Sequence, residues 1–330
     1  MLLDTKQVGN HTSINVYISD SLADKSKKVY GIGQMDLCLG TAQFGMNYGI
    51  QRSGQPTLSD ALDMLDIAIQ NGIDAFDTAA SYGTAEEIIG EYLKKHPNSR
   101  ARVELFSKPP ASIVDGVPQE KHATAIKESL LKSLCKLKTD YLDGYILHNP
   151  SHIFCESVVE SLVQMKNEGI VKMVGVSIYT PDEAKAGIDR GLDLLQIPYS
   201  VFDQRFAEQG MLSFADSRGV NLYARSAFTQ GLLLMRDNDI PSKLEKAQPL
   251  VRRYTRLCED FGFSRLHFAI AFVGRQQSIK RLVFGVDNKE QLIEIINANR
   301  EHIPEESLKE AERQFAGLDE EIIMPSKWGI

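Results

Sequence analysis

The sequence has few of the features that mark secreted or membrane proteins. Its four cysteines are far apart and form no C-x-x-C pair: Cys38, Cys135, Cys155 and Cys258. We expect these thiols to be reduced and packed as small apolar side chains, which suits a reducing compartment. No apolar run approaches the ~18 residues of a membrane-spanning helix, and the N-terminus lacks the basic and apolar regions of a signal peptide. The sequence therefore predicts a cytoplasmic protein with no membrane partner.

Metal and nucleic-acid sites lack support as well. None of the seven histidines belongs to an H-E-x-x-H motif, and Pro150 disfavours a continuous helix that would pair His148 with His152. A formal net charge of −7 at pH 7 disfavours binding to nucleic acid. We therefore expect no bound metal and no nucleic-acid partner.

What the sequence does contain is one pattern repeated eight times. Short apolar runs, often rich in β-branched residues, alternate with amphipathic helical patterns. The runs cover residues 37–41, 75–79, 103–108, 142–148, 171–177, 192–198, 220–226 and 281–286. Strands that alternate with helices form parallel sheets, and eight such units close readily on themselves. The pattern predicts an α/β fold, a single-domain (β/α)8 TIM barrel; a nine-stranded or doubly wound sheet is the alternative.

The domain organisation follows from where this alternation begins. Residues 1–34 precede it, and we expect them to form a partly ordered N-terminal extension. Residues 35–330 contain no low-complexity tract or linker, so they form the predicted barrel. Residues 231–250, between the seventh strand and its helix, are long enough for a lid or specificity loop.

Helix starts are marked by capping residues. Thr57 is followed three residues later by Asp60, and Thr180 by Glu183, which are both arrangements typical of a capping box. Asn288 begins another helical pattern in the same way, although its signal is weaker. These residues fix the predicted starts of three helices that follow strands.

Four polar side chains follow three consecutive predicted strands. Asp77 lies near the end of the second strand and Tyr82 follows it, Lys108 ends the third, and His148 ends the fourth. Each has an ordinary structural interpretation by itself, such as a helix cap, packing or a solvated charge. In a parallel barrel, however, the carboxyl ends of all strands meet at one rim. We therefore expect a carboxylate, a phenol, an ammonium and an imidazole to lie together there.

The combination suits the reduction of a carbonyl group, which needs hydride at carbon and a proton at oxygen. A phenol with its ordinary pKa near ~10 is a weak acid–base catalyst at neutral pH. An ammonium such as that of Lys108 favours the phenolate and lowers that pKa. Asp77 would keep Lys108 charged and in place, Tyr82 would transfer the proton, and His148 would donate to the substrate oxygen or relay a proton.

Three segments carry a resemblance to a known family. The run D-T-A-A-S-Y-G from Asp77 to Gly83, followed by E-E-I-I-G, resembles the signature of the aldo/keto reductases. The segments L-K-T-D-Y-L-D-G-Y-I-L-H (137–148) and N-E-G-I-V-K-M-V-G-V-S (167–177) are similar to that family's fourth and fifth strand regions. The resemblance implies that Tyr82 is the acid/base, that Asp77 and Lys108 tune it, and that His148 orients the carbonyl.

The resemblance also implies a nicotinamide dinucleotide extended across the barrel mouth. No G-x-G-x-x-G motif follows a strand, so the sequence lacks the signature of the doubly wound dinucleotide fold. The positions that match the family's cofactor contacts are Gly40, Thr41, Ser177, Gln196, Arg225, Ser226, Gly285, Asn288 and Glu294. By this match Ser177 and Gln196 would bind the carboxamide, Ser226 the pyrophosphate and Glu294 the adenine amine.

The remaining matched positions have less specific roles. Gly40, Thr41 and Gly285 lie where the family's backbone approaches the cofactor. Asn288 caps the helix whose dipole would face a ribose phosphate.

Three positions depart from the family pattern. Ile178 stands where the family usually has Asn, so one carboxamide contact is lost. Arg225 stands where an aromatic ring commonly stacks on the nicotinamide, and its charge would disfavour the oxidised, cationic ring. Near the 2′-phosphate position, Asp287 would repel that group and Lys289 would attract it. The family preference indicates NADPH as cofactor, with NADH left open.

Other functions stay open at this level. Lys108 could form a Schiff base, as in class I aldolases, although a neighbouring Asp77 would stabilise its ammonium instead. The barrel could be a non-catalytic NADPH-binding redox sensor that regulates a partner, or a redox-neutral epimerase with a bound cofactor. The substrate is read only as a small-molecule carbonyl, with simple aldehydes, ketones and sugars all open, and the oligomeric state is not determined.

Overall fold

A computed structural model describes residues 34–47, 49 and 54–328 of the 330-residue chain. The predicted N-terminal extension, residues 1–34, lies outside the described residues except for Gln34. Its division from the barrel therefore stays a prediction.

Eight parallel strands form a closed barrel, in the order in which they occur along the chain. They are β1 (Asp36–Gly40), β2 (Ala75–Asp77), β3 (Glu104–Ser107), β4 (Leu142–Leu147), β5 (Val171–Ser177), β6 (Leu194–Pro198), β7 (Asn221–Arg225) and β8 (Ile279–Gly285). Because β1 pairs with both β2 and β8, the ring closes between its first and last strands. The predicted (β/α)8 barrel is thus confirmed, and the doubly wound alternative is wrong.

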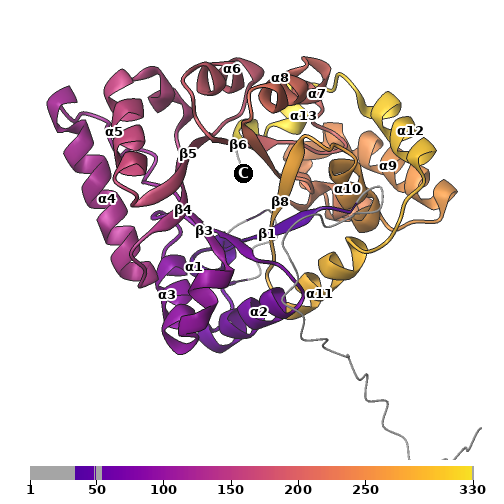
Figure 1. The fold of residues 1–330 in the computed structure, drawn as a ribbon. Helices are drawn as coiled ribbons and strands as arrows, with labels where there is room; N and C mark the ends of the chain where they lie inside the picture. The colour runs from indigo at the N-terminus through magenta and orange to yellow at the C-terminus, as the bar shows by residue number, and fades with distance from the viewer. Residues whose placement is uncertain (1–33, 48, 50–53, 329–330) are drawn as a thin grey trace, which may run out of the picture. The chain divides into compact units, whose positions relative to one another are not determined.

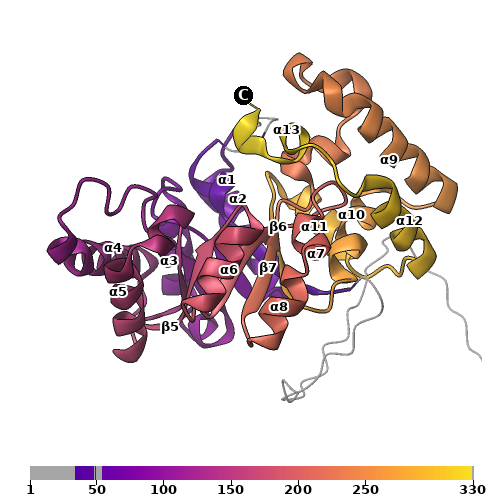
Figure 2. The same ribbon diagram turned by 90° about the horizontal axis from the view of Figure 1, so that it is seen from above.

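Helices surround the strands, as Figure 1 shows. The α-helices are α1 (Ala42–Gly45), α2 (Leu58–Gln70), α3 (Ala85–Lys95), α4 (His122–Leu137), α5 (Glu156–Asn167), α6 (Pro181–Asp189), α7 (Arg205–Glu208), α8 (Met211–Ser217), α9 (Gln248–Phe261), α10 (Arg265–Gly274), α11 (Lys289–Ala298), α12 (Glu305–Phe315) and α13 (Glu320–Ile323). Short 3₁₀ segments are η1 (Pro97–Arg102), η2 (Gln119–Lys121), η3 (Pro150–Phe154), η4 (Thr229–Leu234), η5 (Asp237–Asp239), η6 (Ser242–Ala247) and η7 (Pro325–Lys327). Figure 2 shows α9 standing farther from the strands than α10, with which it forms the connection from β7 to β8.

The barrel interior is filled by side chains from strands on opposite sides of the ring. One cluster consists of Cys38, Ala75, Phe106, Ile146, Leu194 and Tyr223. The rings of Phe106 on β3 and Tyr223 on β7 meet edge to face, with centroids 5.3 Å apart. A larger apolar cluster packs the helices against the outside of the ring. The interior of the ring is therefore a packed core and not a channel.

The predicted helix starts are confirmed. The Thr57 hydroxyl accepts from the backbone N–H of Asp60 at the start of α2. Thr180 and Glu183 form a complete capping box at α6, in which each side chain bonds the other residue's backbone N–H. Asn288 accepts from the backbone N–H at position 291 and caps α11. The local sequence therefore sets where these helices begin.

None of the helices in the described part of the chain is long and apolar enough to cross a membrane. The four cysteines are free, with Cys38 and Cys258 buried in the interior. Burial raises the pKa of the Cys258 thiol to about 12, so this sulfur is protonated at neutral pH.

Candidate active site

A cavity of about 420 Å³ lies at the carboxyl ends of the strands. Each strand supplies a lining residue in its second half or directly after its end: Gly40, Asp77, Lys108, His148, Ser177, Gln196, Arg225 and Gly285. The loop after β7 adds further lining through Ser226, Ala227, Phe228, Gln230, Gly231, Leu234 and Met235. Part of the predicted lid segment, residues 231–250, thus borders the cavity.

Lys108 and Asp77 form a buried ion pair at the floor of this cavity. The Lys108 Nζ lies 2.6 Å from each carboxylate oxygen of Asp77 and 3.2 Å from the carbonyl oxygen of Thr78. The two residues are 2% and 4% exposed, so each charge has little water to replace its partner. Gln196 on β6 donates its amide N–H to Asp77 from the other side, over 2.5 Å. The carboxylate is held by two elements, and the ammonium has a fixed position.

The loop that carries Tyr82 is positioned by close backbone packing. Gly83 has φ +54°, and a Cβ at this position would lie 2.0 Å from the carbonyl oxygen of Gly45 in α1. A Cβ on Gly45 would in turn lie 1.8 Å from the carbonyl oxygen of Tyr82. Only glycine at both positions allows α1 and the Tyr82 loop to approach this closely.

Tyr82 lies between the other two functional groups. The Lys108 Nζ is 5.5 Å from the centroid of the Tyr82 ring. The His148 ring meets the Tyr82 ring edge to face, with centroids 5.9 Å apart. All four side chains that were expected at the rim, those of Asp77, Tyr82, Lys108 and His148, line the one cavity.

His148 is a neutral imidazole at physiological pH. Burial, and then the positive charges of Lys108 and Arg225, lower its pKa to about 4, against an opposing contribution from Asp77. Its Nδ1 lies 3.3 Å from the hydroxyl oxygen of Ser81. When Ser81 donates to Nδ1, the proton of the neutral ring is on Nε2, which is then the donor.

Thr41 contributes to the site from outside the cavity lining. It is buried, and both its backbone N–H and its hydroxyl donate to the carbonyl oxygen of Asp77, over 2.9 and 3.1 Å. The neighbouring Gly40 does line the cavity. The structure thus places Thr41 as a support for the end of β2.

Arg225 points from the end of β7 across β6 toward β5. Its Nε donates to the Ser177 hydroxyl over 3.1 Å, and a terminal nitrogen donates to the Ile178 carbonyl oxygen over 2.7 Å. The guanidinium also stacks over the Tyr179 ring at 4.5 Å from its centroid. These partners are uncharged, so Arg225 adds a positive charge to the cavity wall. Ser177 keeps its own hydroxyl proton to donate to a ligand.

The backbone beside Arg225 is strained. Among the described residues, four non-glycine residues have positive φ, and three of them follow β7: Ser226 (63°), Thr229 (49°) and Gln230 (53°). Such conformations cost about 1–2 kcal/mol each and persist where the surroundings impose them. Ser226 and Gln230 line the cavity, so the strain is located at its wall.

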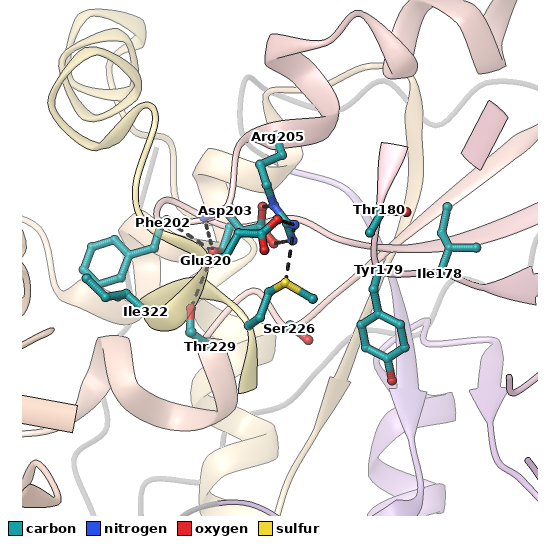
Figure 3. A network of polar contacts seen from close by, with 12 residues as sticks. Ile178, Tyr179, Thr180, Phe202, Asp203, Arg205, Ser226, Thr229, Glu320 and Ile322 are labelled. Carbon is teal, nitrogen blue, oxygen red and sulfur yellow. Dashed lines mark hydrogen bonds and ion pairs between the residues drawn. The ribbon is translucent and has the colours of Figure 1, made fainter. Parts of the chain in front are cut away.

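The C-terminal segment is fastened beside this loop. Arg205 at the start of α7 binds Asp203 in a bidentate pair, at 2.9 and 2.8 Å. The same guanidinium reaches Glu320 of α13 at 3.2 Å and the sulfur of Met324 at 3.6 Å, contacts drawn in Figure 3. Trp328 is buried and donates to the Ile322 carbonyl oxygen, so its side chain packs within this segment.

The cavity continues along β8 to α11. Asp287, Gln291 and Glu294 line it there, next to Gly285. Asn288 lies outside the lining and caps α11 with its side chain. Sequence reasoning placed Gly285, Asn288 and Glu294 at the cofactor; the structure brings Gly285 and Glu294 to the cavity itself.

Lys289, which was expected to attract a ribose phosphate, is engaged elsewhere. Its Nζ lies 3.1 Å from an oxygen of Asp60 and 2.6 Å from one of Asp63, both on α2. Those two carboxylates neutralise it, and it is absent from the cavity lining.

The lining residues that were not predicted from the sequence include Gln43, Tyr179 and Gln291. Gln43 lies against the open side of Gly285, because a Cβ there would come within 2.4 Å of its side-chain oxygen. Tyr179 is brought into the wall by its stacking with Arg225. The only signal available was position, since Gln43 follows a strand end by three residues and Tyr179 by two.

Within the described ranges, no group of three or more His, Cys, Asp or Glu side chains could hold a metal ion. The groups that the cavity does offer are a fixed ammonium, a phenol, a neutral imidazole and hydrogen-bonding side chains from β5, β6 and β7. This set can move a proton and stabilise a developing negative charge on oxygen.

Two solved structures of aldo-keto reductases share this fold. The holo form of one from Bacillus halodurans superposes with a TM-score of 0.68 at 20% identity, covering 87% of this chain and 94% of that chain. A thermostable one in complex with the inhibitor epalrestat gives a TM-score of 0.65 at 23% identity, over 84% and 94% of the two chains. At these identities the likeness establishes a shared fold, the (β/α)8 barrel.

The sequence profile described as the aldo/keto reductase family matches residues 36–314. The chain belongs to this family. Among curated relatives, the uncharacterised oxidoreductase YqkF of Bacillus subtilis (strain 168) is 27% identical, over 84% of this chain and 93% of that protein. A protein of Escherichia coli (strain K12) named NADH-specific methylglyoxal reductase is 25% identical, over 81% and 92%. These relatives support an oxidoreductase.

Proposed function

We propose that the protein is an NAD(P)H-dependent reductase that converts an aldehyde or ketone to an alcohol. The observation that carries this proposal is the buried Lys108–Asp77 pair, which opens onto the same cavity as Tyr82 and His148. Membership of the aldo/keto reductase family supports the reaction class. We also place the protein in the cytoplasm, where its free thiols would stay reduced.

Tyr82 is the proton donor in this proposal. The ammonium of Lys108 lies beside its ring and favours the phenolate, which makes the hydroxyl acidic enough to protonate an alkoxide. Asp77 keeps that ammonium charged and in place, because both of its carboxylate oxygens lie 2.6 Å from the Lys108 Nζ. Proton transfer by a positioned side chain contributes about 10²–10⁴-fold in rate.

His148 orients the carbonyl and stabilises its oxygen. With a pKa of about 4, its imidazole is uncharged at pH 7 and is a hydrogen-bond donor, not a general acid. Donation from Nε2 to the substrate oxygen would favour the negative charge that develops there. Of the two roles expected from the sequence, carbonyl donor and proton relay, the lowered pKa favours the first.

The residues around the cavity fit a nicotinamide dinucleotide, which supplies the hydride when it is bound. Gly40 and Gly285, at the ends of β1 and β8, line the cavity and would bring the backbone close to the ligand. Ser177 and Gln196 turn polar groups into the cavity, and Arg225 and Ser226 would hold the nicotinamide and pyrophosphate portions. The dinucleotide is NADPH or NADH, as the resemblance left open.

The proposed substrate is a small carbonyl compound, with simple aldehydes, ketones and sugars included. A relative named for methylglyoxal supports a small substrate. A Schiff base at Lys108 is disfavoured because the ion pair with Asp77 stabilises the protonated amine, which is not nucleophilic.

Replacing the phenol tests the proposal. We expect Tyr82→Phe to lose turnover by about 10²–10⁴-fold or more across a panel of aldehydes and ketones, while it still binds the reduced cofactor. Tyr141→Phe is the matched control, because the Tyr141 ring packs against Arg100 and Lys172, away from the cavity. Equal turnover of wild type and Tyr82→Phe would refute the mechanism. Cofactor binding by the wild type with no turnover of any carbonyl would favour the redox sensor instead.

A further inference from the structure

The part of the cavity bordered by β8 and α11 is acidic. Its charged lining residues are Asp287 and Glu294, and the other lining residues there are apolar or uncharged: Val283, Phe284, Gly285, Gln291 and Ile295. No lysine or arginine stands among these described lining residues. Among the described lining residues, a ligand that binds here therefore meets two carboxylates and no cation.

Three cationic side chains could have balanced these carboxylates, and each of them contacts other residues instead. Lys289, at the first position of α11, forms ion pairs with Asp60 and Asp63 of α2. Lys108 is held by Asp77. Arg225 reaches across β6 to Ser177 on β5, on the side of β7 opposite to β8.

The ends of a bound dinucleotide can be assigned from the position of the proton donor. Hydride and proton must reach the same carbonyl, so the nicotinamide end has to lie beside Tyr82, Lys108 and His148. The cavity extends from there along β8 to Glu294 of α11. The adenosine end therefore occupies the acidic part.

The Asp287 side chain can accept a hydrogen bond from a hydroxyl group of a ligand. Its backbone N–H donates to the Gln291 side-chain oxygen over 2.8 Å, and the Gln291 amide lies 3.5 Å from the Asp287 Oδ2. The other carboxylate oxygen, Oδ1, has no hydrogen-bond partner among the described residues and can accept a hydrogen bond from a ligand.

We propose that this protein selects NADH over NADPH, and that Asp287 carries the selection. The inference rests on the proposed dinucleotide-dependent function. A 2′-phosphate brings a charge near −2 at pH 7 toward two carboxylates, whereas the 2′-hydroxyl of NADH donates a hydrogen bond to one. The choice of cofactor is then made by charge, at the end of the cavity away from the chemistry.

Direct binding to the full chain tests the selection independently of turnover. We expect fluorescence titration at low ionic strength to give a Kd for NADPH about tenfold or more above that for NADH. Asp287→Asn should lower the ratio of the Kd for NADPH to the Kd for NADH, mainly by strengthening NADPH binding. Added salt should narrow the ratio in the wild type, because a repulsion between charges is screened. The control is Glu290→Gln, since Glu290 is an exposed acid on the same helix that does not line the cavity.

A second pair of substitutions tests the role given to Lys289. Asp60→Asn combined with Asp63→Asn frees this lysine, and we expect the Kd for NADPH to fall while that for NADH stays within about twofold. An unchanged Kd for NADPH would contradict the role given to Lys289.

The outcomes separate the two levels of the proposal. Equal or tighter binding of NADPH by the wild type, or an Asp287→Asn variant with the wild-type ratio, would overturn the selection and leave the reductase intact. Failure of both dinucleotides to bind would overturn the proposed function and the selection together.

Discussion

Lys108 has two anionic contacts, from the two oxygens of Asp77, and almost no contact with water. Burial of His148, and then this nearby positive charge, lower the pKa of the imidazole to about 4. Arg225, whose partners are uncharged, acts on His148 in the same direction. At the scale of single residues, burial and two fixed positive charges together keep one imidazole neutral.

The neutrality of His148 leads to a prediction about its titration. We expect the His148 ring signals in NMR to titrate with a midpoint near 4, and Lys108→Met to raise that midpoint. A midpoint near 6.5 in the wild type would contradict the account.

The same shift makes stability depend on pH. Because the folded pKa is lowered, the unfolded chain takes up a proton first as pH falls, and stability is lost between about pH 6.5 and 4. The loss attributable to His148 between pH 7 and 5 is about 2 kcal/mol. Urea unfolding at the two pH values should show a smaller loss for His148→Gln than for the wild type.

Arg225 gives a second prediction at this scale. If its guanidinium borders the nicotinamide, it disfavours the ring that becomes cationic on oxidation. We expect NAD⁺ to bind several-fold more weakly than NADH by fluorescence titration, and Arg225→Gln to reduce that difference. Arg236→Gln, which changes an exposed arginine outside this cavity, should leave it unchanged. Equal affinities of the wild type for NAD⁺ and NADH would contradict the role given to Arg225.

At the scale of elements, the Tyr82 loop depends on α1. The two segments come from successive units of the barrel, and they touch through the backbones of Gly45 and Gly83. The left-handed backbone at Gly83 turns the chain back after Tyr82 and toward α3. Any side chain at these glycines would push the loop off α1 and displace the phenol.

Substituting Gly83 tests this dependence. We expect Gly83→Ala to lower the free energy of unfolding by about 3 kcal/mol, from the positive φ and the contact with Gly45 together, and to reduce turnover. Gly72→Ala is the matched control, because Gly72 has φ +83° but open space around a Cβ. Gly72→Ala should lower the free energy of unfolding by only about 1 kcal/mol and leave turnover unchanged. Denaturant unfolding and steady-state assays would show whether the two variants differ.

At the scale of the whole barrel, Arg281 ties together strands that are far apart in sequence. From β8 it binds Asp74, just before β2, at 2.8 Å, and Glu104 at the start of β3, at 2.9 Å. These contacts lie at the amino ends of the strands, opposite to the cavity, where barrels are stabilised and not catalytically active. The arginine is 12% exposed, so its removal leaves two carboxylates without their partner.

The position of Arg281 predicts a separation of stability from activity. We expect Arg281→Met to lower the free energy of unfolding by about 3 kcal/mol and to leave the Kd for cofactor unchanged in the folded protein. Lys185→Met removes an exposed ion pair with Asp189 and should change stability by less than about 1 kcal/mol. A loss of cofactor affinity in Arg281→Met would show that the two ends of the barrel are coupled.

Much of this architecture was predictable because it is local. The eight apolar runs coincide with the eight strands, with bounds that differ by at most two residues. The largest overrun, at β2, includes residues 78 and 79, which are buried beyond the strand end and so continue its apolar pattern. The start of β8 at Ile279 was missed because the polar Lys280 interrupts the run there. Burial and strand pairing are separate properties, and the sequence pattern records only burial.

The four residues Asp77, Tyr82, Lys108 and His148 could be found because strand ends of a barrel share one rim. The partners of Gln196 and Lys289 could not be found in this way. Gln196 reaches Asp77, which is 119 residues earlier, and Lys289 reaches Asp63, which is 226 residues earlier. No periodicity along the chain records such pairs.

The sequence by itself determined the alternation of strands and helices, the helix caps, and which side chains stand at the ends of β2, β3 and β4, because each depends on neighbours within one or two turns. Only the closed barrel decided which charges face the cavity and which are neutralised outside it. Arg225 turns toward β5 and Lys289 toward α2 because long side chains go to whichever distant partner the ring brings within reach.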